Sequence, residues 1–238
     1  MKTFRTSAGP FRERPYYTAE EIERICEDAL RATELLPPTP APVRIERFIE
    51  KRFGVTPEYV ELPSGVLGYT WFGAKGVERV AVDRVLDENG DSVSKRRIAT
   101  TLAHEAGHGL LHAHLFAFED QVRTLFGDGL DKDNPKILCR DVPLTEPASA
   151  PSARYDGRWW EYQANHAMAS LLLPRTNVRE CLRGILEPVG TLGIEEVPAS
   201  RQPDAIMRIA DAFEVNLIVA RLRVESLFPA ANRRQLRL

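Results

Sequence analysis

The segment HEAGHGLLH, residues 104–112, constrains what this chain can fold into more than any other stretch. It contains three of the five histidines of the chain. On an α-helix, residues four positions apart lie about 40° apart around the axis and one turn above each other, so His104 and His108 share a face. Two imidazoles placed in this way can bind one Zn²⁺ ion. The fold then has to bring a further ligand to this face from another element.

Glu105 follows the first of these histidines and lies beside the same face, about 60° from His108 by helix geometry. A zinc ion lowers the pKa of a bound water from about 15.7 to roughly 7, which makes that water a nucleophile at neutral pH. A glutamate beside the ion can accept the proton and pass it to the leaving nitrogen of a peptide. We therefore predict that Glu105 is a general base in peptide hydrolysis.

His112 is too far along the helix to be the third ligand, because eight residues rise about 12 Å. We expect His112 and His114 to hydrogen bond near the ligands or to have structural roles. The alternative is a solvated surface helix that carries its histidines by chance. Gly107 and Gly109 argue against it, since a glycine inside a helix costs about 1 kcal/mol relative to alanine. We expect a second element or a substrate backbone to approach closely at these glycines.

The segment EYQANHAMASLLLP, residues 161–174, offers a candidate for the third ligand. Glu161 and Asn165 are four residues apart and face the same way on a helix. Glu161 could complete a site of two histidines and one glutamate, while the Asn165 carbonyl could accept a proton from a ligand histidine. The alternative is that Glu161 is an acidic first-turn residue favoured by the helix dipole. Taken alone, these residues leave both interpretations open.

Together the two segments resemble the ImmA/IrrE family of zinc metallopeptidases, whose members carry an HExxH helix and a later ExxAN(or D)xFAxxLLMP helix. The resemblance implies a zincin-like fold, zinc ligands at His104, His108 and Glu161, and a catalytic base at Glu105. Matching residues are His104, Glu105, Gly107, His108, Leu111, His112, Glu161, Ala164, Asn165, Ala169, Leu172 and Pro174.

The likeness extends over about residues 42–228, with three departures. Ala167 stands where the family usually has phenylalanine, and Asn216 where the closing segment usually has serine. The gap between His108 and Glu161 is also longer than the family leads us to expect. No repressor-type DNA-binding domain is recognisable in front of the peptidase region.

We predict an α+β fold from the pattern of the whole chain. Residues 1–41 form an N-terminal helical extension, 42–200 a zinc peptidase domain, and 201–238 a helix-turn-helix-like tail packed on the core. Residues 119–157, rich in glycine, proline and aspartate, form a long excursion with one strand in ILCRDV. The pattern predicts helices at 18–36, 43–54, 94–118, 159–173, 177–186 and within 204–227, and a small antiparallel sheet from strands near 59–63, 65–73 and 78–86.

Composition excludes several classes of protein. Hydrophobic residues make up 43% of the chain and charged residues 28%, as in folded soluble proteins, and the net charge of −2 indicates no particular partner. No apolar run approaches the roughly 20 residues of a membrane span, and the amino terminus has no signal-peptide pattern, so we expect a cytoplasmic protein. Cys26, Cys139 and Cys181 form no CxxC pair, and we expect reduced thiols.

These features predict a cytoplasmic zinc endopeptidase that cuts one protein partner, such as a transcriptional repressor or antitoxin as the resemblance implies. One alternative is a regulatory protein that binds a repressor or nucleic acid with little proteolysis. Residues 201–238 do hold seven arginines against four acids, but this excess is small beside the pI above about 9 of dedicated nucleic-acid domains.

Another alternative is a purely structural zinc site, which usually has four protein ligands and no open position. Hydrolysis also requires a group that stabilises the oxyanion. The sequence does not choose among the neighbouring candidates Tyr155, Arg158, Tyr162 and His166.

Overall fold

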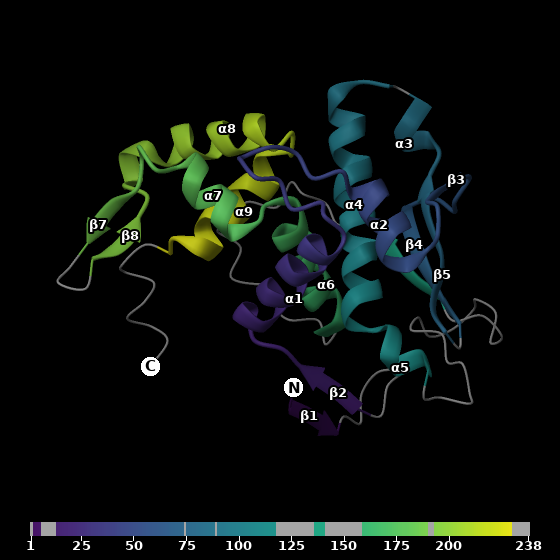
Figure 1. Ribbon diagram of the computed structural model, residues 1–238. Helices are drawn as coiled ribbons and strands as arrows, with labels where there is room; N and C mark the ends of the chain where they lie inside the picture. Colours follow the sequence, from purple (N-terminus) through teal and green to yellow (C-terminus); the bar gives the residue numbers. More distant parts are fainter. Residues whose placement is uncertain are drawn as a thin grey trace.

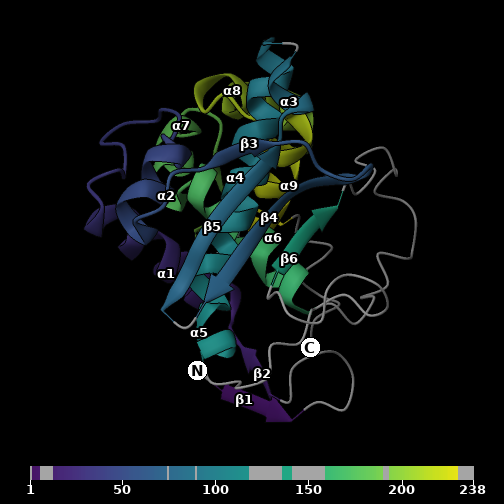
Figure 2. The same ribbon diagram turned by 90° about the vertical axis from the view of Figure 1, so that its right-hand side faces the viewer.

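The long helix α4 (Ser92–Leu111) lies between a small sheet and a group of further helices, as Figures 1 and 2 show. The computed structural model describes residues 2–5, 13–73, 75–88, 90–117, 136–140, 159–189 and 193–229. Helices and small sheets together make the protein α+β, as predicted. Within these ranges no helix is both long enough and apolar enough to span a bilayer.

The sheet on one side of α4 has the strand order β3-β5-β4-β6. Its strands are β3 (Glu58–Val60), β4 (Val66–Gly73), β5 (Gly76–Asp83) and β6 (Lys136–Arg140). Strand β4 pairs antiparallel with β5 and with β6, whereas β3 pairs parallel with β5. The prediction of a purely antiparallel sheet was therefore wrong, because β4 and β5 form a hairpin and β3 lies on the far side of β5.

In this region the end of β5 differs from the prediction, whereas the position of β6 confirms it. The predicted third strand ends at Asp83, whose carboxylate accepts a hydrogen bond from the Val85 amide at 3.1 Å, and Val85–Glu88 then form the short helix α3. Strand β6 lies at the ILCRDV segment, as predicted. The rest of the predicted excursion lies outside the described residues.

Helix boundaries follow the capping signals of the sequence. Helix α1 (Ala19–Ala32) begins with the predicted capping box, in which Thr18 and Glu21 exchange hydrogen bonds of 2.9 and 3.2 Å. It ends earlier than predicted, where Glu34 adopts a φ of 58°. Helix α2 (Ile45–Phe53) ends at Gly54, which has a φ of 75° as expected for a glycine C-cap.

Helix α4 ends at Leu111, with His112 as its C-cap, instead of continuing to residue 118, and helix α5 (Ala113–Ala117) begins directly after His112. No proline or glycine marks this end in the sequence. Asp91 caps its start by accepting a hydrogen bond from the Ser94 amide at 2.7 Å.

The remaining helices are α6 (Trp159–Leu172), α7 (Arg175–Cys181), α8 (Gln202–Ala212) and α9 (Leu217–Leu227), with a short 3₁₀ helix η1 at Ala199–Arg201. Two small antiparallel pairs were not predicted. One joins β1 (Lys2–Arg5) to β2 (Glu13–Tyr16), and the other joins β7 (Glu187–Val189) to β8 (Ile194–Glu196). None of these short strands has the alternating apolar pattern that identifies a strand in a sequence.

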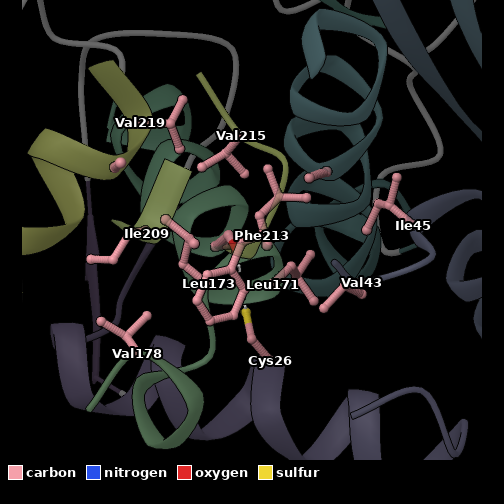
Figure 3. Packing of buried hydrophobic residues seen from close by; sticks show 14 of the residues in the cluster. Cys26, Val43, Ile45, Leu171, Leu173, Val178, Ile209, Phe213, Val215 and Val219 are labelled. Carbon is pink, nitrogen blue, oxygen red and sulfur yellow. Dashed lines mark hydrogen bonds between the residues drawn. The ribbon is translucent and has the colours of Figure 1, made fainter. Parts of the chain in front are cut away.

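One hydrophobic core joins the N-terminal helix, the central helices and the tail. Figure 3 shows side chains from these elements gathered around α6, among them Cys26, Val43, Ile45, Leu171, Leu173, Val178, Ile209, Phe213, Val215 and Val219. The thiol of Cys26 donates to the Ala167 carbonyl at 3.7 Å, and burial raises the pKa of that thiol. Cys26 and Cys181 are buried free thiols, as expected, while the side chain of Cys139 lies outside the described residues.

Candidate metal centre

Helix α6 packs directly against α4 at Gly107, one of the two glycines of the HEAGHGLLH segment. A Cβ atom on Gly107 would lie 2.9 Å from the Cβ of Ala167 and 3.0 Å from the carbonyl oxygen of Ala164. On the other side of α4, a Cβ on Gly109 would lie 2.7 Å from the ring of Phe53. These distances are shorter than van der Waals contact, so a larger residue at either position would force its neighbours to shift. The expected close approach of a second element is confirmed, and Ala167 accounts for part of it.

The α4–α6 contact brings His104, His108 and Glu161 together. Nε2 of His104 lies 3.0 Å from Nε2 of His108 and 3.1 Å from Oε2 of Glu161. Nε2 of His108 lies 3.7 Å from the same carboxylate oxygen. Two donors bound to one tetrahedral zinc at about 2.0–2.1 Å stand roughly 3.3 Å apart, which is within the range of these three distances. This buried group could hold a metal ion.

The surroundings of the three side chains call for a positive charge at their centre. Nδ1 of His104 lies 3.1 Å from Oδ1 of Asn165, which accepts its proton and leaves Nε2 of a neutral His104 as a lone pair. That lone pair faces other acceptor atoms. Oε1 of Glu161 is buried and has no hydrogen-bond partner among the described residues. Because acceptors that face each other repel, a proton or a metal ion between them stabilises the group.

The pKa values of the group agree with this picture. Burial disfavours the charged form of His104, but the hydrogen bond and the negative charge of Glu161 outweigh burial, so its pKa is raised. Burial also opposes ionisation of Glu161, yet the two histidines hold the pKa of its carboxyl well below the usual range. Burial lowers the pKa of His108. The negative charge of Glu161 thus favours a positive charge at this point, either a proton on His104 or a bound cation.

Glu105 is completely buried between α4 and strand β4. Thr70 of β4 donates a hydrogen bond of 2.6 Å to Oε2 of Glu105, and Oε1 has no hydrogen-bond partner among the described residues. Burial raises the pKa of Glu105 to about 8, although the charge of His104 and the Thr70 hydrogen bond lower it in part. Gly68 lets the helix lie this close, because a Cβ there would be 2.7 Å from a Thr101 methyl group and 3.4 Å from Oε1 of Glu105.

His112 lies behind His108 and away from the three ligand atoms. Its Nδ1 is 2.9 Å from Nδ1 of His108, and its Nε2 is 3.0 Å from Oε1 of Gln163. The ring of Trp159 stands edge-on to the His112 ring, with centroids 5.5 Å apart. The expectation of a hydrogen-bonding role agrees with these contacts. His114 is half-buried on α5, and the described residues show no hydrogen bond between it and the ligand atoms.

Sequence patterns did not identify Thr70 or Gln163. Thr70 lies on a strand far from both motifs, and only the alternation of β4 places it on the face toward α4. Gln163 lies two residues after Glu161, a spacing that points it to a different side of an isolated helix. No signal in the sequence shows that Gln163 faces His112.

Of the four candidates for oxyanion stabilisation, the structure describes only Tyr162 and His166, and among the described residues no hydrogen bond joins either of them to His104, His108 or Glu161. Tyr155 and Arg158 lie outside the described residues. The rings of Tyr162 and His166 contact each other with centroids 4.6 Å apart, and Tyr162 is 56% exposed. Burial lowers the pKa of His166, and the charged groups that act on it are Arg223 and Glu23 rather than the metal group.

Comparison with models of known protein families gives no match for this chain, and comparison with curated proteins gives no significant match. The metal group is therefore described by its own geometry: three converging ligands, one buried carboxylate beside them, and a hydrogen-bond partner behind each histidine.

Proposed function

We propose that this protein is a zinc-dependent endopeptidase with a zincin-like fold, in which His104, His108 and Glu161 hold the metal and Glu105 is the general base. The observation that supports it best is that three ligand atoms from two helices lie close enough together to bind one metal ion. Catalytic zinc sites use three protein ligands and leave one position open.

The ligand set favours zinc over other metals. Two imidazoles and one carboxylate bind zinc in several peptidases, whereas calcium and magnesium prefer sites built from oxygen ligands. A bound zinc ion would supply Lewis acidity, polarising a carbonyl and lowering the pKa of a water.

Glu105 would take up the proton of that water and deliver it to the leaving nitrogen. Thr70 occupies Oε2, so Oε1 is the oxygen left without a partner. A general base works best when its pKa lies near the working pH. The pKa of Glu105 is about 8 without a metal, and a cation held by His104 would lower it toward neutrality.

The resemblance to the ImmA/IrrE family suggests the substrate class, a protein partner such as a transcriptional repressor or antitoxin. One arginine of the tail is unavailable to nucleic-acid phosphates, because Arg223 is buried and donates to Glu23 at 2.8 Å.

The experiment that tests the proposal uses the full chain and the variant Glu105→Gln. Each is produced together with the proteins encoded beside it, metals are measured in the purified chain by mass spectrometry, and partner proteins are searched for fragments. We expect about one zinc per chain in both forms, fragments with the natural sequence, and none with the variant. A chain that binds no zinc, or a variant that still produces the fragments, would contradict the proposal.

A further inference from the structure

A row of buried hydrogen-bonding groups connects His108 to the backbone of the N-terminal strand β2. Nδ1 of His108 contacts Nδ1 of His112 at 2.9 Å, and Nε2 of His112 contacts Oε1 of Gln163 at 3.0 Å. Nε2 of Gln163 then donates to the carbonyl oxygen of Pro15 at 2.8 Å. His108 and His112 are 0% exposed and Gln163 is 3% exposed, so these groups depend on each other for hydrogen bonds.

The Pro15 carbonyl at the end of the row determines which atom of each group carries the hydrogen-bonding proton. The carbonyl oxygen of Pro15 can only accept a hydrogen bond, so the amide nitrogen of Gln163 has to face it. The amide oxygen of Gln163 then faces His112 and can only accept, which places the ring proton of His112 on Nε2. His112 is fully buried and hydrogen bonds to no carboxylate among the described residues, so it is neutral and its Nδ1 is an acceptor. The remaining proton therefore belongs to Nδ1 of His108.

This order of protons determines which atom of His108 is available to a metal. With its proton on Nδ1, His108 presents a lone pair on Nε2, the atom that lies 3.0 Å from Nε2 of His104. Asn165 has the same effect on His104 through its own Nδ1. The two ligands are thus oriented by different partners. Asn165 orients His104, and the row of His112, Gln163 and the Pro15 carbonyl of strand β2 orients His108.

We propose that Gln163 is a positioning residue for the metal centre: fixed by the Pro15 carbonyl, it sets the tautomer and ring orientation of His112, and through His112 those of His108. The proposal rests on the zinc site described above. It also assigns a role to strand β2, whose backbone carbonyl is the fixed acceptor at the end of the row. Partners behind ligand histidines typically change metal affinity by roughly 10- to 100-fold.

A packing role for Gln163 is the competing explanation, and two variants separate it from positioning. Gln163→Met keeps the length of the side chain but removes the acceptor for His112. Gln163→Glu keeps an oxygen that can accept the proton of His112 Nε2 but loses the amide that donates to the Pro15 carbonyl. If Gln163 positions the ligand, zinc affinity falls roughly 10- to 100-fold in the methionine variant and falls less in the glutamate variant. If Gln163 only fills space, methionine is the better replacement.

The experiment measures zinc affinity of the full chain by competition with a chromogenic chelator, together with thermal unfolding of the metal-free forms. Ser170→Ala is the matched control, because Ser170 lies on the same helix and is also 3% exposed, and within the described part of the chain its hydroxyl bonds only the His166 carbonyl, at 2.9 Å. We expect unchanged zinc affinity in this control. Nitrogen NMR of the histidine rings in the zinc form should show protons on Nδ1 of His108 and Nε2 of His112, with the His112 assignment lost in the methionine variant.

The outcomes separate this proposal from the proposed function. Equal zinc affinity in the natural sequence and Gln163→Met, or a His112 proton on Nδ1, would overturn the positioning role and leave the zinc site standing. A natural chain that binds no zinc would overturn both. Loss of affinity in Ser170→Ala as large as in Gln163→Met would show that any buried change in α6 disturbs the site, and the specific role of Gln163 would be rejected.

Discussion

Two polar clusters lie near opposite ends of helix α6, one at Glu161 in its first turn and one at Leu173 just after its last residue, and they differ in the balance of hydrogen-bond donors and acceptors. In the first, between α1 and α9, the Arg223 guanidinium donates to both carboxylate oxygens of Glu23 at 2.8 and 3.3 Å and to the Leu173 carbonyl at 3.0 Å. Arg175 adds a further contact of 3.2 Å to the same carboxylate. Every charge in this cluster has an opposite charge beside it.

The second cluster, between α4 and α6, has an excess of acceptors. The ligand atoms of His104, His108 and Glu161 face one another, and the described residues provide no donor for Oε1 of Glu161 or Oε1 of Glu105. Buried polar groups are nearly always paired in proteins, so a group that lacks one kind of partner is informative. The balanced cluster therefore joins α1, α9 and the end of α6, whereas the unbalanced one could hold a metal ion.

The same substitution placed in each cluster should give the largest contrast. Glu161→Gln removes a charged ligand, and we expect zinc affinity to fall by more than the roughly 100-fold that loss of a supporting partner causes. Glu23→Gln should lower the thermal stability and leave zinc affinity unchanged. Chelator competition and thermal unfolding measure both effects. Equal zinc affinity in the two variants would remove the distinction between the clusters.

Loss of a donor from the balanced cluster should mainly affect folding. Arg223→Met leaves Glu23 partly buried with only Arg175 beside it, and breaking a buried ion pair costs about 3–5 kcal/mol. We expect the lower end, about 3 kcal/mol, which corresponds to a fall in Tm of roughly 6–12 °C for a chain of this size.

Zinc bound by the folded fraction of Arg223→Met should be unaffected. The double variant Arg223→Met with Glu23→Leu should recover part of the stability, because it removes the stranded charge. A double variant less stable than either single one would show that the pair contributes through packing instead.

The contact between α4 and α6 can be disturbed without changing any polar group. In Gly107→Ala the new methyl group would lie 2.9 Å from Ala167 and 3.0 Å from the Ala164 carbonyl. Overpacking of this kind costs about 1–3 kcal/mol. We also expect weaker zinc binding, because Glu161 would move away with α6. Gly184→Ala is the control, since nothing lies within 4 Å of a Cβ there, and its stability should be unchanged or slightly higher.

Much of this site could be predicted because its ligands follow helix periodicity. The spacing of His104 and His108 fixes a shared face, and the cost of Gly107 within a helix indicated the close approach that Ala164 and Ala167 provide. Local capping signals likewise fixed the start of α1 and the end of α2. These predictions depend on the geometry of one helix and its immediate neighbours.

What the sequence did not predict depends on contacts between distant segments. The carboxylate of Glu105 is fixed by Thr70, which is brought close only by the packing of β4 on α4. The row from His108 ends on Pro15, which precedes Gln163 by well over half the chain. The parallel pairing of β3 with β5 is also a matter of topology. Periodicity within one segment carries no information on such partners.

The smallest expected effect is on the stability of the metal-free protein, which is lowered when the buried carboxyl of Glu105 ionises. Burial raises the pKa of Glu105 from its ordinary value of 4.5 to about 8. Between pH 4.5 and 8 the Glu105 carboxyl is therefore protonated in the folded state and ionised in the unfolded state. Stability attributable to this group is therefore complete below pH of about 4.5 and is lost as the pH rises toward about 8. Glu105→Gln carries no such ionisation. Its amide still lacks one partner, which limits the gain at pH 8 to about 1 kcal/mol, or roughly 2–4 °C in Tm.

Thermal unfolding in a chelator at pH 5 and pH 8 measures this gain. The Tm of Glu105→Gln should exceed that of the natural sequence at pH 8 and approach it at pH 5. Glu61→Gln, which changes an exposed residue of the loop between β3 and β4, should show the same small difference at both pH values. Parallel curves for Glu105→Gln and the natural sequence would mean that Glu105 is paired in solution. The metal cluster would then be as balanced as the ion pair of Arg223 and Glu23, and the contrast between the two regions would no longer indicate which of them binds a cation.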